Sequence, residues 1–258
     1  MKKAAVIKEE KGFRYLETGK GDVLLLLHGL FGALSNFKEV IDFFSKKMKV
    51  CIPLLPLYTL PAEQTTVEGL VNYIRDFINH KKYKSLILLG NSLGGHIALM
   101  YTMQHPKKVR SIVLTGSSGL FENSLGDSYP RKSDYAFVKQ KTEYTFYDPA
   151  IATKELVDEV YEIVNNRDKA LRILYLAKSA LRNNLREHLQ KINVPVMLIW
   201  GKDDRITPAF VAEEFNELLP RSELRLIDQC GHAAMMEKSD EFNLILERFL
   251  NTLSQSKS

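Results

Sequence analysis

The chain has 258 residues, of which 45% are hydrophobic and 26% are charged, so it can bury the core of one large α/β domain with an inserted subdomain. Its formal net charge is +5, yet Lys and Arg alternate with Asp and Glu and form no basic block, which argues against nucleic-acid binding. Two cysteines, Cys51 and Cys230, are too few for a disulfide scaffold and predict a reduced, cytoplasmic setting.

The N-terminal residues begin with lysines, as a secretion signal would. Charged residues at 8–11 end the apolar segment after four residues, which is too short for a signal peptide. The longest apolar run, at 23–27, is far shorter than a membrane span. We therefore expect a soluble protein with no membrane partner.

The first part of the chain alternates between strand-like and helix-like segments. The segment at 23–29 is apolar on consecutive positions, as in a central strand of a parallel sheet that is covered on both faces. Periodicity and turn residues predict the remaining elements. These are an edge hairpin of strands 4–8 and 12–18, a helix at 35–47, a strand at 50–56, a helix at 67–80, a strand at 86–89 with a helix after it, and a strand at 109–115.

Residues 120–191 have a different character, because they contain no apolar run of strand type. They predict helical segments at 133–141, 153–164, 168–182 and 184–190. Alternation resumes with a strand at 194–200, a helix at 208–219, a strand at 223–227 and a closing helix at 241–253. We predict an α/β fold, a doubly wound, mostly parallel sheet built from 1–119 and 192–258, with a helical cap at 120–191 over the carboxyl ends of the strands.

The segment Gly90-Asn91-Ser92-Leu93-Gly94 lies between a predicted buried strand and an amphipathic helix. It matches the G-x-S-x-G nucleophile elbow, a tight turn that exposes one side chain above the sheet. The glycines occupy positions where a Cβ would collide with neighbouring backbone. Ser92 is therefore the candidate nucleophile, and the alternative is a chance glycine turn with a structural serine.

A serine hydroxyl needs a base within hydrogen-bond reach and an anion that orients the base. Asp203 and Asp204 follow the strand at 194–199, and His232 follows the strand that ends at residue 227. Both loops are expected at the sheet edge that carries Ser92. The chain order Ser, Asp, His is that of the α/β-hydrolase triad.

Four motifs together resemble the α/β-hydrolase superfamily, in particular its cap-bearing serine esterases and carbon–carbon bond hydrolases: HGLFG, GNSLGG, WGKDDRITP and CGH. The match covers roughly residues 23–119 and 192–253. The resemblance implies that Asp204, the fourth residue counted from the glycine after its strand, is the acid rather than Asp203, and that His232 is the base. It also implies an oxyanion hole made by the backbone N–H groups of Leu30 and Leu93, where the alternative is that both leucines simply pack.

Other conspicuous side chains have plainer interpretations. The remaining histidines are expected to be structural, with His28 bracing loops. Most aromatic residues of the cap are expected to form its small core and a minority to line an acyl or alcohol pocket; they are Phe121, Tyr129, Tyr135, Phe137, Tyr144, Phe146 and Tyr147. Met235 and Met236 could likewise either pack in a core or line the pocket. Cations and acids of the cap nearly balance, so the sequence indicates no anionic substrate.

The chain departs from relatives in three places. Residues 55–59 lack the glycines that many relatives carry in the corresponding turn. Ala233 follows His232, where ring-cleavage carbon–carbon hydrolases typically carry tryptophan, and this argues against that subgroup. Haloalkane dehalogenases use aspartate at the elbow, so Ser92 argues against them.

We predict a cytoplasmic serine hydrolase that cleaves a small or medium carboxylic ester, thioester or similar acyl compound through an acyl-Ser92 intermediate. Its partner is a small-molecule acyl substrate; no metal or organic cofactor is implied, and the chain would be a monomer or homodimer. Carbon–carbon bond hydrolysis or acyl transfer on the same triad is the alternative chemistry. A ligand-sensing receptor with vestigial hydrolysis is the alternative from another class, and a scaffold is least favoured because it would leave the triad unexplained.

Overall fold

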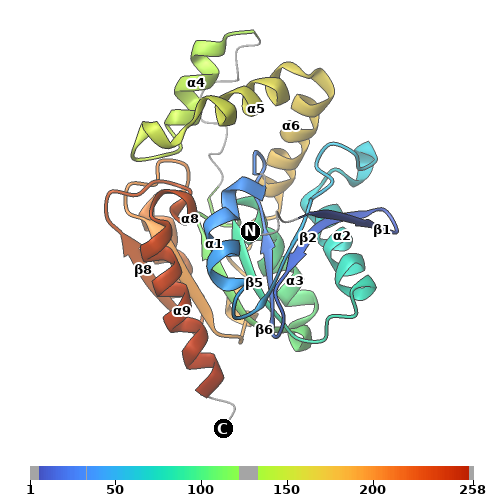
Figure 1. Ribbon diagram of the computed structural model, residues 1–258, viewed down its shortest axis with the longest axis vertical. Coiled ribbons are helices and arrows are strands. Elements are labelled where there is room, and N and C mark those ends of the chain that lie inside the picture. Colours follow the sequence, from blue (N-terminus) through green and yellow to red (C-terminus); the bar gives the residue numbers. More distant parts are fainter. Residues whose placement is uncertain (1–5, 33, 122–132, 256–258) are drawn as a thin grey trace.

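The computed structural model describes residues 6–32, 34–121 and 133–255. Among these residues, eight strands form one sheet in the order β1-β2-β4-β3-β5-β6-β7-β8. Antiparallel pairing joins β1 to β2 and β2 to β4, and every other pair is parallel, which confirms the predicted mostly parallel α/β sheet (Figure 1). The strands are β1 (Ile7–Glu10), β2 (Phe13–Thr18), β3 (Val23–Leu27), β4 (Lys49–Pro53), β5 (Leu86–Asn91), β6 (Val109–Thr115), β7 (Val196–Gly201) and β8 (Ser222–Ile227).

Helices cover both faces of the sheet because its central strands are apolar at consecutive positions. Leu25 and Leu27 of β3 pack into a core with the helices α2 (Val67–His80), α3 (Leu93–Gln104) and α7 (Ala209–Leu218). Leu24 and Leu26 point to the opposite face and pack with α1 (Lys38–Phe44) and α9 (Ser239–Gln255). Alternation of side chains along each strand therefore divides one apolar run between two cores.

The described chain between β6 and β7 is helical and contains no strand. Three helices, α4 (Tyr135–Glu143), α5 (Lys154–Asn165) and α6 (Arg167–Arg182), lie over one end of the sheet (Figure 1). We call the described residues of this region, 120–121 and 133–191, the helical insertion. Each of the three helices begins with a side chain that accepts a hydrogen bond from a backbone N–H of the first turn, supplied by Asp134, Thr153 and Asn166 in turn.

Several predicted boundaries need correction. The helix expected at 184–190 is wrong: Leu185 N–H donates to Gly119 O at 2.8 Å, so this backbone bonds to the sheet domain and forms only the short 3-10 turn η5 (Leu189–Lys191). The helix expected at 35–47 begins as η1 (Leu34–Phe37) and ends at Phe44. The first strand begins at Ile7, and residues 4 and 5 lie outside the described ranges. Elements that the periodicity did not predict are η2 (Ala62–Gln64), η3 (Pro106–Lys108), η4 (Pro149–Ile151) and α8 (Ala234–Glu237).

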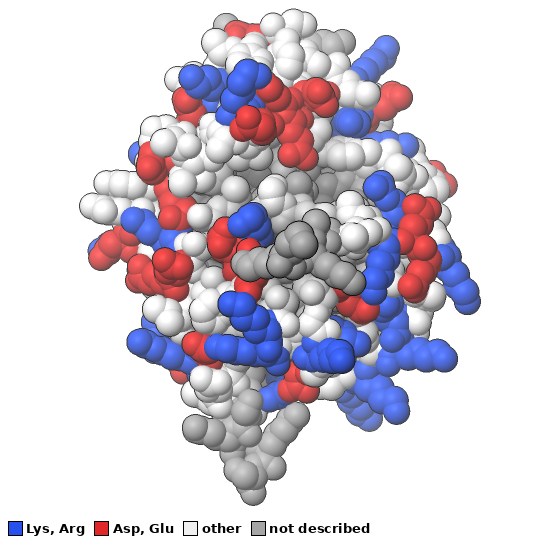
Figure 2. All heavy atoms as spheres, viewed as in Figure 1, with Lys and Arg blue, Asp and Glu red and all other residues white. Residues whose placement is uncertain are grey.

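Charges of both signs are mixed on the surface (Figure 2), and the two cysteines are not joined in a disulfide bond. Basic and acidic side chains are interspersed on the face shown in Figure 2, and a group of acidic side chains gathers on the helical insertion, the upper part of the view. Cys51 and Cys230 are buried free thiols, and burial raises the pKa of each to about 12. None of the helices in the described ranges is long and apolar enough to cross a bilayer.

Candidate active site

Ser92 occupies the sharp turn between β5 and α3. Its φ of 54° lies in the left-handed region, which a non-glycine residue adopts only when its surroundings enforce it. A Cβ on Gly90 would lie 2.4 Å from Gly94 O, and one on Gly94 would lie 2.0 Å from Leu27 O, so neither position accepts a side chain. This is the strand–turn–helix geometry that the motif predicts.

The neighbouring strand end fixes this turn. Ser92 N–H donates to Thr115 O at 3.2 Å, and Ser118 N–H donates to Ser92 O at 3.1 Å. Both bonds connect the elbow to the end of β6. The backbone that carries the Ser92 hydroxyl is therefore held from two sides.

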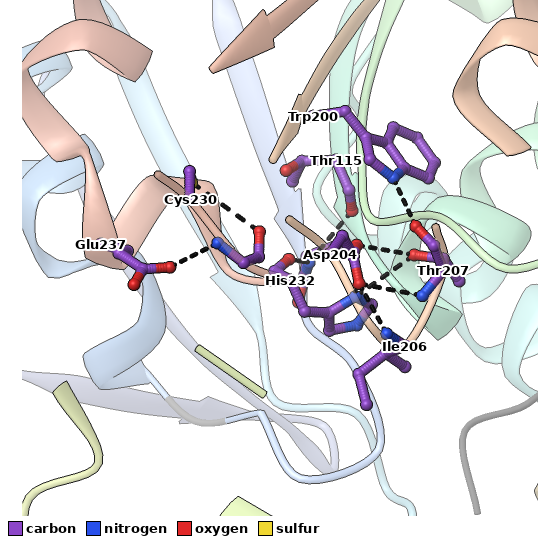
Figure 3. Close-up of polar contacts among 10 residues, drawn as sticks. Thr115, Trp200, Asp204, Ile206, Thr207, Cys230, His232 and Glu237 are labelled. Atoms are coloured by element: carbon purple, nitrogen blue, oxygen red, sulfur yellow. Dashed lines mark hydrogen bonds and ion pairs between the residues drawn. The ribbon is translucent and has the colours of Figure 1, made fainter. Parts of the chain in front are cut away.

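His232 and Asp204 form a buried pair. His232 Nδ1 lies 2.9 Å from Asp204 Oδ2, and the two side chains are 9% and 0% exposed (Figure 3). Asp204 Oδ1 accepts from the N–H groups of Ile206 at 2.8 Å and Thr207 at 2.9 Å, and Oδ2 accepts from Thr207 Oγ1 at 2.9 Å. Because Nδ1 faces the carboxylate, Nε2 is the ring nitrogen left to exchange a proton with another group.

Asn91 and Gly116 contact the loop between β8 and α8 that carries His232, which we call the His232 loop. The sequence analysis did not identify either residue as part of the site. Asn91 Nδ2 donates to Thr115 O at 3.0 Å and to His232 O at 3.3 Å. A Cβ on Gly116 would lie 2.7 Å from His232 Nδ1, so the imidazole packs directly on glycine backbone. Asn91 was only the variable position of the elbow motif and carried no signal of its own.

Thr207 was also missed. An aspartate in a loop commonly accepts hydrogen bonds from backbone N–H groups a few residues further along the chain, so a turn after Asp204 could have been expected, but not the contact from the Thr207 hydroxyl. Trp200 Nε1 donates to Thr207 O at 2.7 Å, so the only tryptophan of the chain anchors the turn that holds the Asp204 carboxylate (Figure 3).

A cavity of about 380 Å³, the main cavity, opens beside Ser92 and His232. Its lining comes from the loop after β3, the His232 loop and the helical insertion, and it includes Leu30, Ala233 and Met236. A second cavity of about 10 Å³, the small cavity, is bordered by Ser92, Leu30 and Leu93 with α6 side chains. Ser92 and Leu30 therefore border both cavities.

The helical insertion gives more aromatic side chains to these cavities than we expected. Phe137, Tyr144 and Phe146 line the main cavity, and Phe121 lines the small one. Packing within the insertion was the expected role for most of them, and it is seen for Tyr135, whose ring contacts Tyr161. Tyr147 is 42% exposed, and Tyr129 lies outside the described residues. The two methionines after His232 have different surroundings: Met236 lines the main cavity, and Met235 is fully buried.

The two buried histidines away from Asp204 have structural partners. His28 Nδ1 lies 2.9 Å from Gly29 O, its Nε2 accepts from Leu55 N–H at 3.1 Å, and burial lowers its pKa; it braces the loops after β3 and β4 as expected. His96 Nε2 lies 2.9 Å from Asn183 O, and burial lowers its pKa to about 4. Within the described ranges, no three or more His, Cys, Asp or Glu side chains are grouped to hold a metal ion.

The two leucines of the expected oxyanion hole lie beside Ser92. Leu93 is the first residue of α3, so its N–H has no acceptor within the helix. Leu30 lies in a turn closed by a 3.1 Å bond from Gly32 N–H to Gly29 O, and Tyr58 Oη donates to Leu30 O at 3.2 Å. A Cβ on Gly29 would lie 3.1 Å from Ser92 Cβ, so this loop passes directly against the serine.

The sheet order, the strained serine turn and the helical insertion define an α/β hydrolase. The family model described as serine aminopeptidase S33 matches residues 58–239, and the chain belongs to this family of α/β hydrolases. A solved α/β hydrolase enzyme, MGS-MChE2 from the metagenome of lagoon sediments of Mar Chica, Morocco, is 44% identical, with a TM-score of 0.80 over 96% of this chain and 98% of that one.

More distant relatives differ in their named substrates. The 2-hydroxy-6-oxo-6-(2'-aminophenyl)hexa-2,4-dienoic acid hydrolase of Metapseudomonas resinovorans is 29% identical over 89% of this chain and 84% of that protein. The pimeloyl-[acyl-carrier protein] methyl ester esterase of Nitrosomonas europaea is 26% identical over 87% and 94%. The fold also matches the meta-cleavage product hydrolase CumD of Pseudomonas fluorescens, which is 21% identical with a TM-score of 0.80 over 93% and 95% of the two chains.

Proposed function

We propose that this protein is a serine hydrolase that cleaves a carboxylic ester or related acyl compound through an acyl-Ser92 intermediate. The observation that carries the proposal is that Ser92 borders the same cavity as His232, whose Nδ1 is bonded to Asp204. His232 Nε2 would take the hydroxyl proton as Ser92 Oγ attacks the carbonyl carbon, and would return it to the departing alcohol. Water, activated by the same histidine, would then release the acid and regenerate Ser92.

The developing oxyanion requires donors that are already in place. The backbone N–H groups of Leu30 and Leu93 are our candidates, because both residues border the small cavity together with Ser92 and the Leu93 N–H has no helical acceptor. The helical insertion would serve as a cap, because its side chains complete the wall of the main cavity.

The two cavities suggest an ester with unequal halves. The main cavity, about 380 Å³, lies in the range of pockets that bind small molecules. The small cavity, about 10 Å³, has room for a single water molecule or a methyl-sized group. We therefore expect turnover of esters with one extended half and one very small half, and little turnover when both halves are bulky.

Carbon–carbon bond hydrolysis is the second candidate, because several curated relatives are named as hydrolases of 2-hydroxy-6-oxo-dienoic acids. Ala233 favours ester hydrolysis over carbon–carbon bond hydrolysis. It lines the main cavity at the position where ring-cleavage hydrolases typically carry tryptophan, so a large ring that would shape the pocket is missing from that wall.

The test compares the purified protein with Ser92→Ala on a series of 4-nitrophenyl esters, with intact-mass measurement after a fluorophosphonate probe. We expect turnover and a one-probe mass increase for the native protein only, with kcat lower by about 10⁴-fold or more in the variant. A folded native protein that is inert to both the esters and the probe would contradict the proposal.

A further inference from the structure

The charged side chains of the main cavity are of one sign. Apart from His232, only Lys141 and Arg205 among its described lining residues can carry a charge, and no aspartate or glutamate is among them. On the outside, the helical insertion bears a group of acidic side chains, visible in the upper part of Figure 2. The balance of charge along the sequence therefore does not extend to the cavity wall.

The two cations come from different parts of the fold and meet at one aromatic ring. Lys141 belongs to α4, and its Nζ lies 5.8 Å from the Tyr144 ring centroid and 5.6 Å from that of Phe137. Arg205 belongs to the loop after β7, and its guanidinium carbon lies 5.3 Å from the Tyr144 centroid. Attraction to the ring faces holds both cations at the cavity wall without neutralising them.

Neither cation forms an ion pair within the described residues, whereas their neighbours do. Lys139, on the same helix as Lys141, lies 3.6 Å from Glu143. Lys202, on the same loop as Arg205, lies 2.9 Å from Asp228. Of these four cations, the two without an acidic partner among the described residues are therefore the two that line the main cavity.

Resting on the hydrolase function proposed above, we propose that Lys141 and Arg205 form an anion subsite. The substrate is an ester that carries a carboxylate at the far end of the half that occupies the main cavity. A guanidinium fork matches the two oxygens of a carboxylate, and the ammonium adds a second charge. Tyr144 supports both cations, and the apolar wall between them and Ser92 accepts the chain that links the carboxylate to the ester.

The test measures kcat/KM for two matched pairs of esters. In the acyl pair, monomethyl adipate is compared with methyl hexanoate, and in the alcohol pair, 6-acetoxyhexanoate is compared with hexyl acetate, with hydrolysis followed by proton release in both pairs. We expect the native protein to prefer the anionic member of one pair by about tenfold. Lys141→Met and Arg205→Met should each reduce that ratio by about threefold to tenfold, and raising the salt concentration should reduce it in the native protein.

Lys139→Met and Lys202→Met are the matched controls, because each removes one cation from the same helix or loop outside the cavity lining. Their anionic-to-neutral ratio should equal that of the native protein. The proposal is overturned if the native protein prefers the anionic member of neither pair, or if the cavity variants lower both members of a pair equally. Hydrolysis of the neutral esters without any such preference removes only the anion subsite, whereas failure on all four esters and on the fluorophosphonate removes the hydrolase function itself.

Discussion

The main cavity has two walls that are built differently. The wall from the sheet carries Ser92 and His232, with Asp204 buried against His232, at strand ends where glycine contacts and backbone hydrogen bonds determine their positions. The wall from the helical insertion consists of side chains, and its Tyr144 is 46% exposed as a whole residue, whereas His232 on the other wall is 7% exposed. Several hydrogen bonds tie the insertion to the sheet domain, among them the bond from His232 N–H to Thr145 O at 2.9 Å.

The two walls suit two different tasks of the proposed site, the reaction itself and the choice of substrate. Positions set by backbone are accurate and rigid, as the reacting groups of an acyl transfer require. Positions set by side chains on an inserted helix can vary in chemistry without disturbing the sheet, which suits the choice of substrate. We therefore expect substitutions in the sheet wall to lower turnover of every ester, and substitutions in the wall of the insertion to change which ester is preferred.

Apart from Ser92→Ala, the largest effect should come from Asp204→Asn. An amide cannot orient and stabilise the imidazole as the carboxylate does, so kcat on a 4-nitrophenyl ester should fall by about 10⁴-fold. Asp203→Asn is the control, because the structure pairs Asp204 rather than Asp203 with His232. Equal losses in the two variants would show that the contact between Asp204 and His232 is not the one that supports turnover.

The sheet wall could be largely predicted from the sequence, because its backbone geometry restricts which residue types can occupy its positions. Gly90 and Gly94 have no room for a side chain, and consecutive apolar positions in β3 reveal a strand between two cores. The wall of the insertion could not be anticipated. Which face of α4 meets the cavity depends on contacts between segments far apart in the chain, such as His232 N–H with Thr145 O just after α4, and no local pattern encodes them. Contacts with distant segments also explain why the helix predicted at 184–190 is wrong, because Leu185 N–H bonds to Gly119 O.

Gly116→Ala should have the next largest effect. The new Cβ would lie 2.7 Å from His232 Nδ1 and 2.8 Å from its Cε1 and its backbone O, so His232 must shift and its contact with Asp204 is disturbed. A displacement of this kind should lower kcat by about 100-fold. Gly12→Ala is the matched control, because Gly12 also has positive φ, +81° against +51°, but its Cβ would meet nothing within 4 Å. Both variants should lose about 1 kcal/mol of unfolding free energy through backbone strain, and only Gly116→Ala should lose activity.

His96 joins the two parts of the molecule, and it should make their stability depend on pH. It lies on the elbow helix, is fully buried, and meets the Asn183 carbonyl at the end of α6. Burial lowers its pKa from 6.5 to about 4, so between these values the unfolded chain binds more protons than the folded one. The free energy of unfolding should therefore fall by about 3 kcal/mol as pH decreases from 7 to 4.

Denaturant unfolding at several pH values measures this dependence. His96→Gln keeps a donor for Asn183 O and cannot titrate, so its unfolding free energy should vary less with pH over this window. His188→Gln, at an exposed position, is the control and should keep the native slope. An unchanged slope in His96→Gln would mean that other groups carry the acid sensitivity.

The smallest effect tests the contact between the base loop and the insertion. Glu237 Oε2 accepts from Gly231 N–H at 2.6 Å (Figure 3). Its Oε1 accepts from Asp148 N–H at 2.6 Å, so one carboxylate joins the His232 loop to the helical insertion. Glu237→Gln keeps one acceptor and turns an amide NH₂ toward the other N–H. Loss of one charge-assisted bond should lower kcat by about tenfold with a smaller change in KM, because it displaces His232 rather than a binding group.

Asp228→Asn is the control for this substitution, because it removes a carboxylate from the loop that carries His232, and among the described residues this carboxylate pairs only with exposed Lys202. It should leave kcat and the melting temperature close to native values. If Glu237→Gln lowers the melting temperature but retains native kcat, the carboxylate is only a structural link. If it lowers kcat in a protein that melts normally, the position of the insertion reaches the base through Glu237, and the two walls act together in turnover.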